Sequence, residues 1–82
     1  MDEREIIIRA LKAEATAKPN ERIYVGFKSL TYKEFVEMLD NHKKLDKMGK
    51  EFVESFLKTA VKMFRENQAY RENMMKLAGV KP

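Results

Sequence analysis

The side chains that most often carry enzyme or metal chemistry are scarce in this sequence. His42 is the only histidine, cysteine is absent, and the 3 glycines lie far apart, so there is no glycine-rich phosphate loop. A metal site needs several ligands, yet Asp40 and His42 have no third ligand at helical spacing. His42 lies among lysines at a predicted helix end, where a solvated or capping imidazole is more common than a catalytic one. We therefore expect no catalytic residue, metal, cofactor or small-molecule substrate, and hence no enzyme.

Two glutamates lie on one side of a predicted helix, but their neighbours argue against acid–base work. Glu51 follows Lys47 by four residues, and Glu54 is four residues from both Lys50 and Lys58. Oppositely charged side chains at this spacing form ordinary ion pairs along a helix. We expect such pairs here rather than a general acid and base.

Basic side chains give the clearest sign of a binding surface. One group is predicted at a corner between two helices, and a second group follows on one face of the last helix. A contact to an anion or a nucleic acid would use His42, Lys43, Lys44, Lys47, Lys50, Lys58, Lys62 and Arg65. Arginine, which reads guanine in the major groove, is sparse, and glutamates interrupt the basic face. A solvated lysine face is the favoured interpretation, and nucleic-acid binding is the alternative.

A second candidate surface is aromatic. Tyr24, Phe27 and Tyr32 could form an exposed patch beside Arg22 and Lys28, suited to stacking on a base or holding a peptide. The other interpretation is that these rings cover the top of a small core.

The elements that must position these residues begin with a predicted helix from about Asp2 to Lys18. Asp2 followed by Glu5 is typical of an N-cap, and Pro19 ends the helix. Residues 22–31 alternate between apolar and polar side chains, which predicts a short β-hairpin with a turn or bulge at Gly26, or else an extended loop.

A second helix is predicted to begin at a capping box. Thr31 is followed three residues later by Glu34 and then by an apolar run, and the helix closes at residues 41–44. A long last helix then covers about residues 46–78, capped by Asp46 and stopped by Gly79, with a break near Asn67 as the alternative. Residues 48–64 are expected to form the core. Residues 65–78 are expected to project towards another chain or to fold onto the first helix.

A seven-residue apolar repeat runs through the last helix. The predicted self-association seam consists of Val53, Phe56, Ala60, Met63, Asn67, Tyr70, Met74 and Leu77. Asn67 is the single amide in this stripe, and a buried asparagine in such a position fixes the register of paired helices. The alternative is that the stripe is ordinary intramolecular core.

Composition sets the class of protein. The chain has 82 residues, 44% hydrophobic and 37% charged, with a formal net charge of +4. No apolar run is long enough for a bilayer, and the acidic start lacks the layout of a signal peptide. We expect a single small, mostly α-helical, cytoplasmic domain spanning 1–82, with three helices and no membrane contact. The leading hypothesis is a non-enzymatic interaction or regulatory module that forms a homo-oligomer, with a dimer favoured, and that has a possible protein partner. The alternative is a small basic nucleic-acid-binding protein acting as a dimer.

Overall fold

The computed structural model describes residues 2–25 and 28–81, and it confirms a mostly helical fold with a hairpin. The predictions for Gly26 and Phe27 lie outside the described residues. In chain order the elements are α1 (Glu3–Ala17), β1 (Arg22–Val25), β2 (Lys28–Thr31), α2 (Tyr32–Asp40), the short 3₁₀ helix η1 (His42–Lys44), α3 (Lys47–Glu66) and α4 (Gln68–Leu77).

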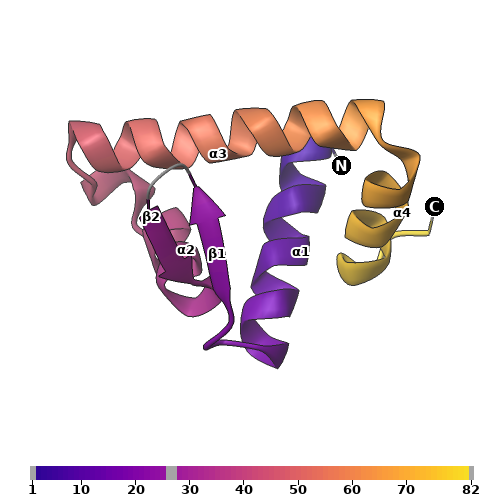
Figure 1. The fold of residues 1–82 in the computed structure, drawn as a ribbon, viewed down its shortest axis with the longest axis horizontal. Helices are drawn as coiled ribbons and strands as arrows, with labels where there is room; N and C mark the ends of the chain where they lie inside the picture. The colour runs from indigo at the N-terminus through magenta and orange to yellow at the C-terminus, as the bar shows by residue number, and fades with distance from the viewer. Residues whose placement is uncertain (1, 26–27, 82) are drawn as a thin grey trace.

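Helix α3 runs along the top of the molecule in Figure 1, and all the other elements lie below it. Helices α1 and α4 pack against one another below α3, and α2 with the hairpin occupies the other end. The chain measures 35 × 24 × 23 Å along its principal axes. One long side of α3 is therefore left without a covering layer (Figure 1).

The three predicted helix starts are confirmed by their caps. The side chains of Asp2, Thr31 and Asp46 each accept a hydrogen bond from the backbone N–H three residues later, at 2.8, 3.1 and 2.7 Å. At α2 the capping box is complete, because a Glu34 carboxylate oxygen accepts from the Thr31 backbone N–H at 2.9 Å. These hydrogen bonds supply the partners that the first turn of a helix otherwise lacks.

The segment after α1 forms the predicted hairpin rather than an extended loop. The strands are antiparallel, with Ile23 opposite Leu30 and Tyr24 opposite Ser29. Ile23 and Leu30 pack against the core, which gives this two-stranded sheet the support it needs in water. On the other face, the Arg22 guanidinium donates to the Ser29 hydroxyl at 3.0 and 3.1 Å.

The predicted last helix is broken at Asn67, so the described residues hold four α-helices rather than three. Asn67 has an extended backbone (φ −119°, ψ 108°), and its side chain accepts from the Tyr70 N–H at 3.0 Å as the N-cap of α4. An asparagine side chain competes well for such a cap, which explains the break. The predicted stop at Gly79 is confirmed: its φ is +75°, and the Val80 N–H donates to the Met75 carbonyl at 2.8 Å.

The core lies between α1, α2 and α3. Phe35 of α2 is fully buried, and its ring centroid lies 4.5 Å from that of Phe56 and 6.2 Å from that of Phe52. The buried apolar residues that surround it are Ile6, Ile7, Leu11, Val53, Leu57, Ala60 and Phe64. The prediction that the core begins at Met48 is wrong, because Met48 is 70% exposed on the side of α3 that faces away from Val53. None of the described helices is long and apolar enough to cross a membrane.

Candidate functional site

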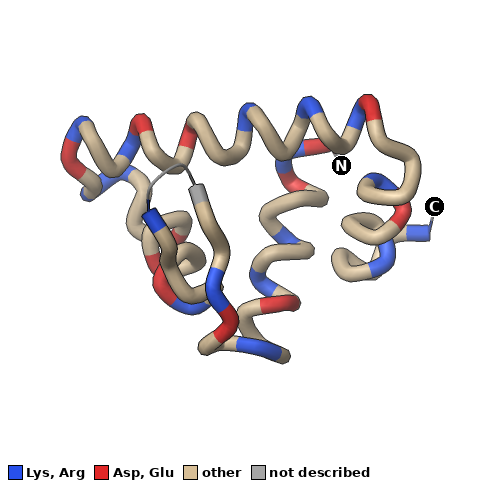
Figure 2. Tube along the Cα trace, viewed as in Figure 1, with Lys and Arg blue, Asp and Glu red and all other residues tan. Residues whose placement is uncertain are grey.

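Six exposed lysines lie on η1 and along one side of α3, and we call them the lysine strip. Figure 2 shows basic residues spaced along α3 with acidic residues between them. Lys47, Lys58 and Lys62 share a side of α3 because intervals of eleven and four residues are close to whole helical turns. The lysine strip consists of Lys43, Lys44, Lys47, Lys50, Lys58 and Lys62.

None of the lysines in the strip forms an ion pair within the described chain, although the exposed Glu51 lies on the same side of α3. Among the described residues, no carboxylate oxygen lies within 4.0 Å of any of the six ammonium groups. The ion pairs predicted for Glu51 with Lys47 and for Glu54 with Lys50 and Lys58 are therefore wrong. Glu54 is turned towards α1, and the two lysines next to it have no carboxylate within ion-pair distance in the described chain.

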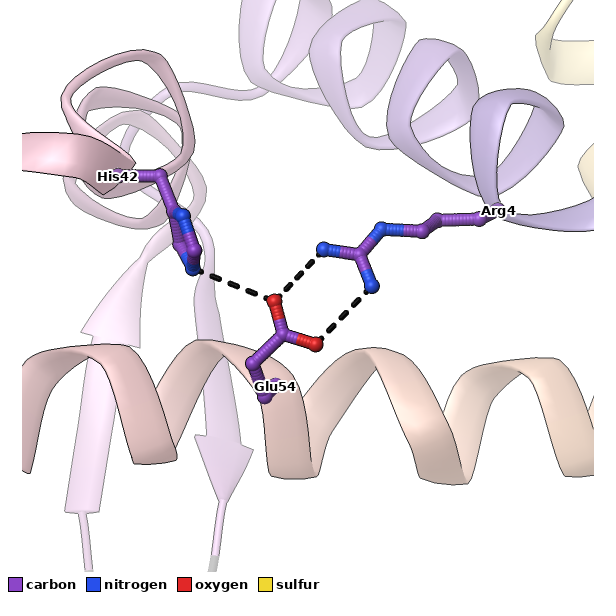
Figure 3. Close-up of polar contacts among 3 residues, drawn as sticks. All are labelled: Arg4, His42 and Glu54. Atoms are coloured by element: carbon purple, nitrogen blue, oxygen red, sulfur yellow. Dashed lines mark hydrogen bonds and ion pairs between the residues drawn. The ribbon is translucent and has the colours of Figure 1, made fainter.

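Glu54 is held by an arginine from the start of the chain (Figure 3). The Arg4 guanidinium of α1 donates two hydrogen bonds to the Glu54 carboxylate, with N···O distances of 2.7 and 3.0 Å. These hydrogen bonds lower the pKa of Glu54 and raise the pKa of Arg4. Both side chains are about half exposed, at 47% and 46%, so this contact orients the carboxylate more than it stabilises the fold.

His42 approaches the same carboxylate from η1. Its Nε2 atom is shielded from solvent and lies 3.2 Å from Glu54 Oε1 (Figure 3). The alignment is not that of a hydrogen bond, and Nε2 has no other hydrogen-bond partner among the described residues. The Nε2 atom of His42 therefore faces the fold, while 35% of the side chain stays exposed.

Arg65 is also engaged within the fold. Its Nε atom donates to Glu3 Oε2 at 2.7 Å, which joins the end of α3 to the start of α1. Of the eight basic residues predicted as a contact surface, the six lysines are exposed and unpaired within the described chain. His42 and Arg65 instead face carboxylates. The sequence reasoning missed the role of Arg4, which lies 50 residues from Glu54.

The residues of the predicted seam mostly face the molecule's own core. Val53 and Ala60 are buried, and Phe56, Tyr70 and Met74 pack against the same core cluster. Leu77 is partly buried, whereas Met63 and Asn67 are exposed. Residues 68–77 fold onto α1, which was one of the two predicted courses for this segment. Self-association stays a prediction.

The predicted aromatic patch is divided by the fold. Tyr24 is 75% exposed on the hairpin, whereas Tyr32 packs against the core, and burial raises its pKa. Lys28 is placed with its ammonium nitrogen 5.7 Å from the centre of the Phe52 ring. Of the aromatic rings in the predicted patch, Tyr24 is the exposed one in the described part of the chain.

A hollow lies beside the C-terminal part of the lysine strip, at Lys58 and Lys62. Its lining comes from Arg4 and from nine residues of α3 between Glu54 and Glu66. Leu57 and Val61 are apolar, Lys58, Lys62 and Arg65 are basic, and Glu54 and Glu66 are acidic. In the described ranges, no three metal-binding side chains come close enough together to hold an ion. The hollow is therefore an open surface of mixed charge.

Comparison with known proteins finds no matching family model, no similar curated protein and no similar solved structure.

The Arg4–Glu54 contact should affect how Glu54 titrates. In Arg4→Met, the pKa of Glu54 should rise back towards that of an ordinary glutamate, because the two hydrogen bonds that favour its ionised form are lost. Since the folded pKa of Glu54 is lowered, its contribution to stability is present above the ordinary glutamate pKa of about 4.3 and is lost as the pH falls through the folded value.

Carboxyl carbon chemical shifts of Glu54, followed by NMR between pH 2 and 7, measure this change directly. Lys12→Met is the matched control, because Lys12 pairs with Asp40 at 3.0 Å and not with Glu54. An unchanged Glu54 pKa in Arg4→Met would show that the contact does not persist in solution.

Proposed function

We propose that this protein is a non-enzymatic domain that binds the phosphate backbone of a nucleic acid through the lysine strip. The observation that carries this proposal is the set of six exposed lysines with no carboxylate within 4.0 Å in the described chain. The chain's net charge of +4 gives the same sign to its long-range field.

The spacing of the lysines supports an extended anion as the partner. Lys47 and Lys62 are fifteen residues apart on one helix, which corresponds to about 22 Å at 1.5 Å per residue. That length exceeds any single phosphate group and matches several successive phosphates of a duplex. A small anionic metabolite would contact only one or two of these lysines.

The type of side chain supports contact with the backbone rather than with bases. Each ammonium group is a point charge on a flexible stem, whereas base readout in the major groove relies on the planar forks of Arg, Asn and Gln. Arg65, the one arginine among the predicted contacts, is already bound to Glu3. We therefore expect binding that is strongly dependent on salt and nearly independent of sequence.

The packing of α3 against the rest of the fold is also suited to phosphate binding. Four of its residues, Val53, Leu57, Ala60 and Phe64, are buried against the rest of the fold, while its opposite side is uncovered (Figure 1). Arg4 holds Glu54 away from the neighbouring lysines, which reduces the repulsion that this carboxylate would exert on a phosphate. Lys47, Lys58 and Lys62 point away from this buried side of α3 and are exposed before any partner binds.

Binding of a labelled 20-base-pair duplex, measured by fluorescence anisotropy between about 50 and 200 mM salt, tests the proposal. If all six lysines contact phosphates, the slope of log K against log salt is about −5. The triple variant Lys43→Ala, Lys44→Ala and Lys47→Ala should weaken binding at least tenfold and make the slope about 3 less steep. Two duplexes of unrelated sequence should bind alike.

The matched control is the triple variant Lys33→Ala, Lys76→Ala and Lys81→Ala. It removes the same charge from exposed lysines outside the strip. This control should lose much less affinity than the strip variant. Equal losses in the two variants would show that binding depends on net charge alone and not on the lysine strip. An absence of binding by the wild type at about 50 mM salt would refute the proposal.

A further inference from the structure

The joint between α3 and α4 consists of one residue, and the seven-residue apolar repeat continues across it. The helices end and begin at Glu66 and Gln68, with only Asn67 between them. The seven-residue apolar repeat nevertheless keeps its phase from Val53 through Asn67 to Leu77. Two helices that pack separately have no need to share a phase, whereas one continuous helix does. No proline or glycine stands between residues 50 and 78 to oppose continuity.

From this we infer that the protein forms a dimer by exchange of α4. In the exchanged form, α3 and α4 join into one straight helix of about 46 Å, and α4 packs on α1 of a second copy. The partner is thus a second copy of this chain, and the surface that receives it is the apolar side of α1. This inference goes beyond the proposed function and does not depend on it.

The hydrogen bonds at the joint are closely balanced between the two forms. In the bent chain, the described residues 68–70 make no backbone bonds to the carbonyls of residues 64–66, and a straight helix would form all three. Against this, the bent chain gains the Asn67 cap on the Tyr70 N–H and a bond from Arg71 to the Phe64 carbonyl, at 3.0 and 3.4 Å. The straight form thus has three backbone hydrogen bonds at the joint where the bent form has two that involve side chains, a difference of one.

The apolar packing of α4 explains why α3 and α4 can join into a straight helix only when a second copy is present. Tyr70, Met74, Met75, Ala78 and Val80 pack against the core cluster in the bent chain. A lone straight chain would expose these residues together with the face of α1 that they cover. Two chains that exchange α4 recover the same contacts without any new complementary surface. A short hinge between two packed elements also favours such an exchange.

Two substitutions at the joint should shift the equilibrium in opposite directions. Asn67→Ala removes the cap of the bent form and places the best helix former at the hinge. It should lower the dissociation constant of the dimer about 25-fold. Each of the two chains loses one cap, and each lost cap contributes a factor of about five. Gln68→Pro occupies the first position of α4, where no N–H is needed, and the extended Asn67 already suits a following proline. In a straight helix the same proline would clash, so this variant should remain monomeric.

Sedimentation velocity of the wild type and both variants up to high micromolar concentration measures the dimer. Spin labels at exposed residues 50 and 76 then identify its form, with labelled chains diluted into unlabelled ones. A straight helix places these sites about 39 Å apart. The bent chain gives a shorter distance because α4 leaves the axis of α3 (Figure 1).

The expected result is a dimer in Asn67→Ala with the long distance, and a folded monomer in Gln68→Pro with the short one. An Asn67→Ala variant that stays monomeric overturns the inference, and so does a dimer that keeps the short distance. Because no nucleic acid is present, failure here would leave the proposed function standing. If both hold, the exchanged dimer carries two lysine strips on one particle.

Discussion

Replacing Phe35 by alanine is expected to lower the free energy of unfolding by about 3–5 kcal/mol. Phe35 is fully buried, and its ring packs against Phe52 and Phe56 of α3. The loss combines the transfer free energy of the ring with the cavity that it leaves, since neighbouring elements relax only in part. Small domains have total stabilities of about 5–15 kcal/mol, so the variant should be partly unfolded at physiological temperature.

Urea unfolding followed by circular dichroism measures this loss. Phe35→Leu is the matched control, because it keeps an apolar side chain of intermediate size and should retain much of the lost stability. If Phe35→Ala costs less than about 1 kcal/mol, the packing of α2 on α3 differs from the arrangement described.

Tyr70→Asp is expected to lower the free energy of unfolding by about 2–4 kcal/mol, through lost ring contacts and a poorly solvated carboxylate. Tyr70 packs against the core from α4, and burial, followed by the proximity of Tyr32, raises the pKa of its hydroxyl. The damage should appear in the monomer at any protein concentration.

Thermal and urea unfolding at low micromolar concentration test this expectation, with Tyr24→Asp as the matched control. Tyr24 undergoes the same chemical change at a site that is 75% exposed, so its effect should stay within about 0.5 kcal/mol. A stable Tyr70→Asp monomer would show that Tyr70 is dispensable for packing within one chain. The residue would then be free to serve only the seam predicted from the sequence.

Features of this fold that depend on neighbouring residues could be predicted from the sequence. Thr31 with Glu34, Asp46 before a helical stretch, and Gly79 after one each act within a few residues, so their local chemistry specifies the structure. The sequence predicts the hairpin less specifically. An alternating segment of ten residues is also compatible with a loop, because a two-stranded hairpin is stable only when it packs against other elements.

The candidate site was predictable only in its composition. The sequence identified the lysines, yet it could not show that Glu54 turns to Arg4, because that contact depends on how α1 crosses α3. Asn67 illustrates a different limit. Its amide fits both a buried heptad position and a helix cap, and the folding of α4 onto α1 decides between the two.

The order of the elements has a consequence for synthesis on the ribosome. The apolar side of α1 is made first, but much of its cover comes from α3 and α4, in the second half of the chain. Phe64, a member of the same core cluster as Ile7, is added 47 residues after α1 ends at Ala17. At translation rates of about 5–20 residues per second, α1 waits about 2–9 seconds for that cover. During that interval its isoleucines are open to chaperones and to neighbouring nascent chains.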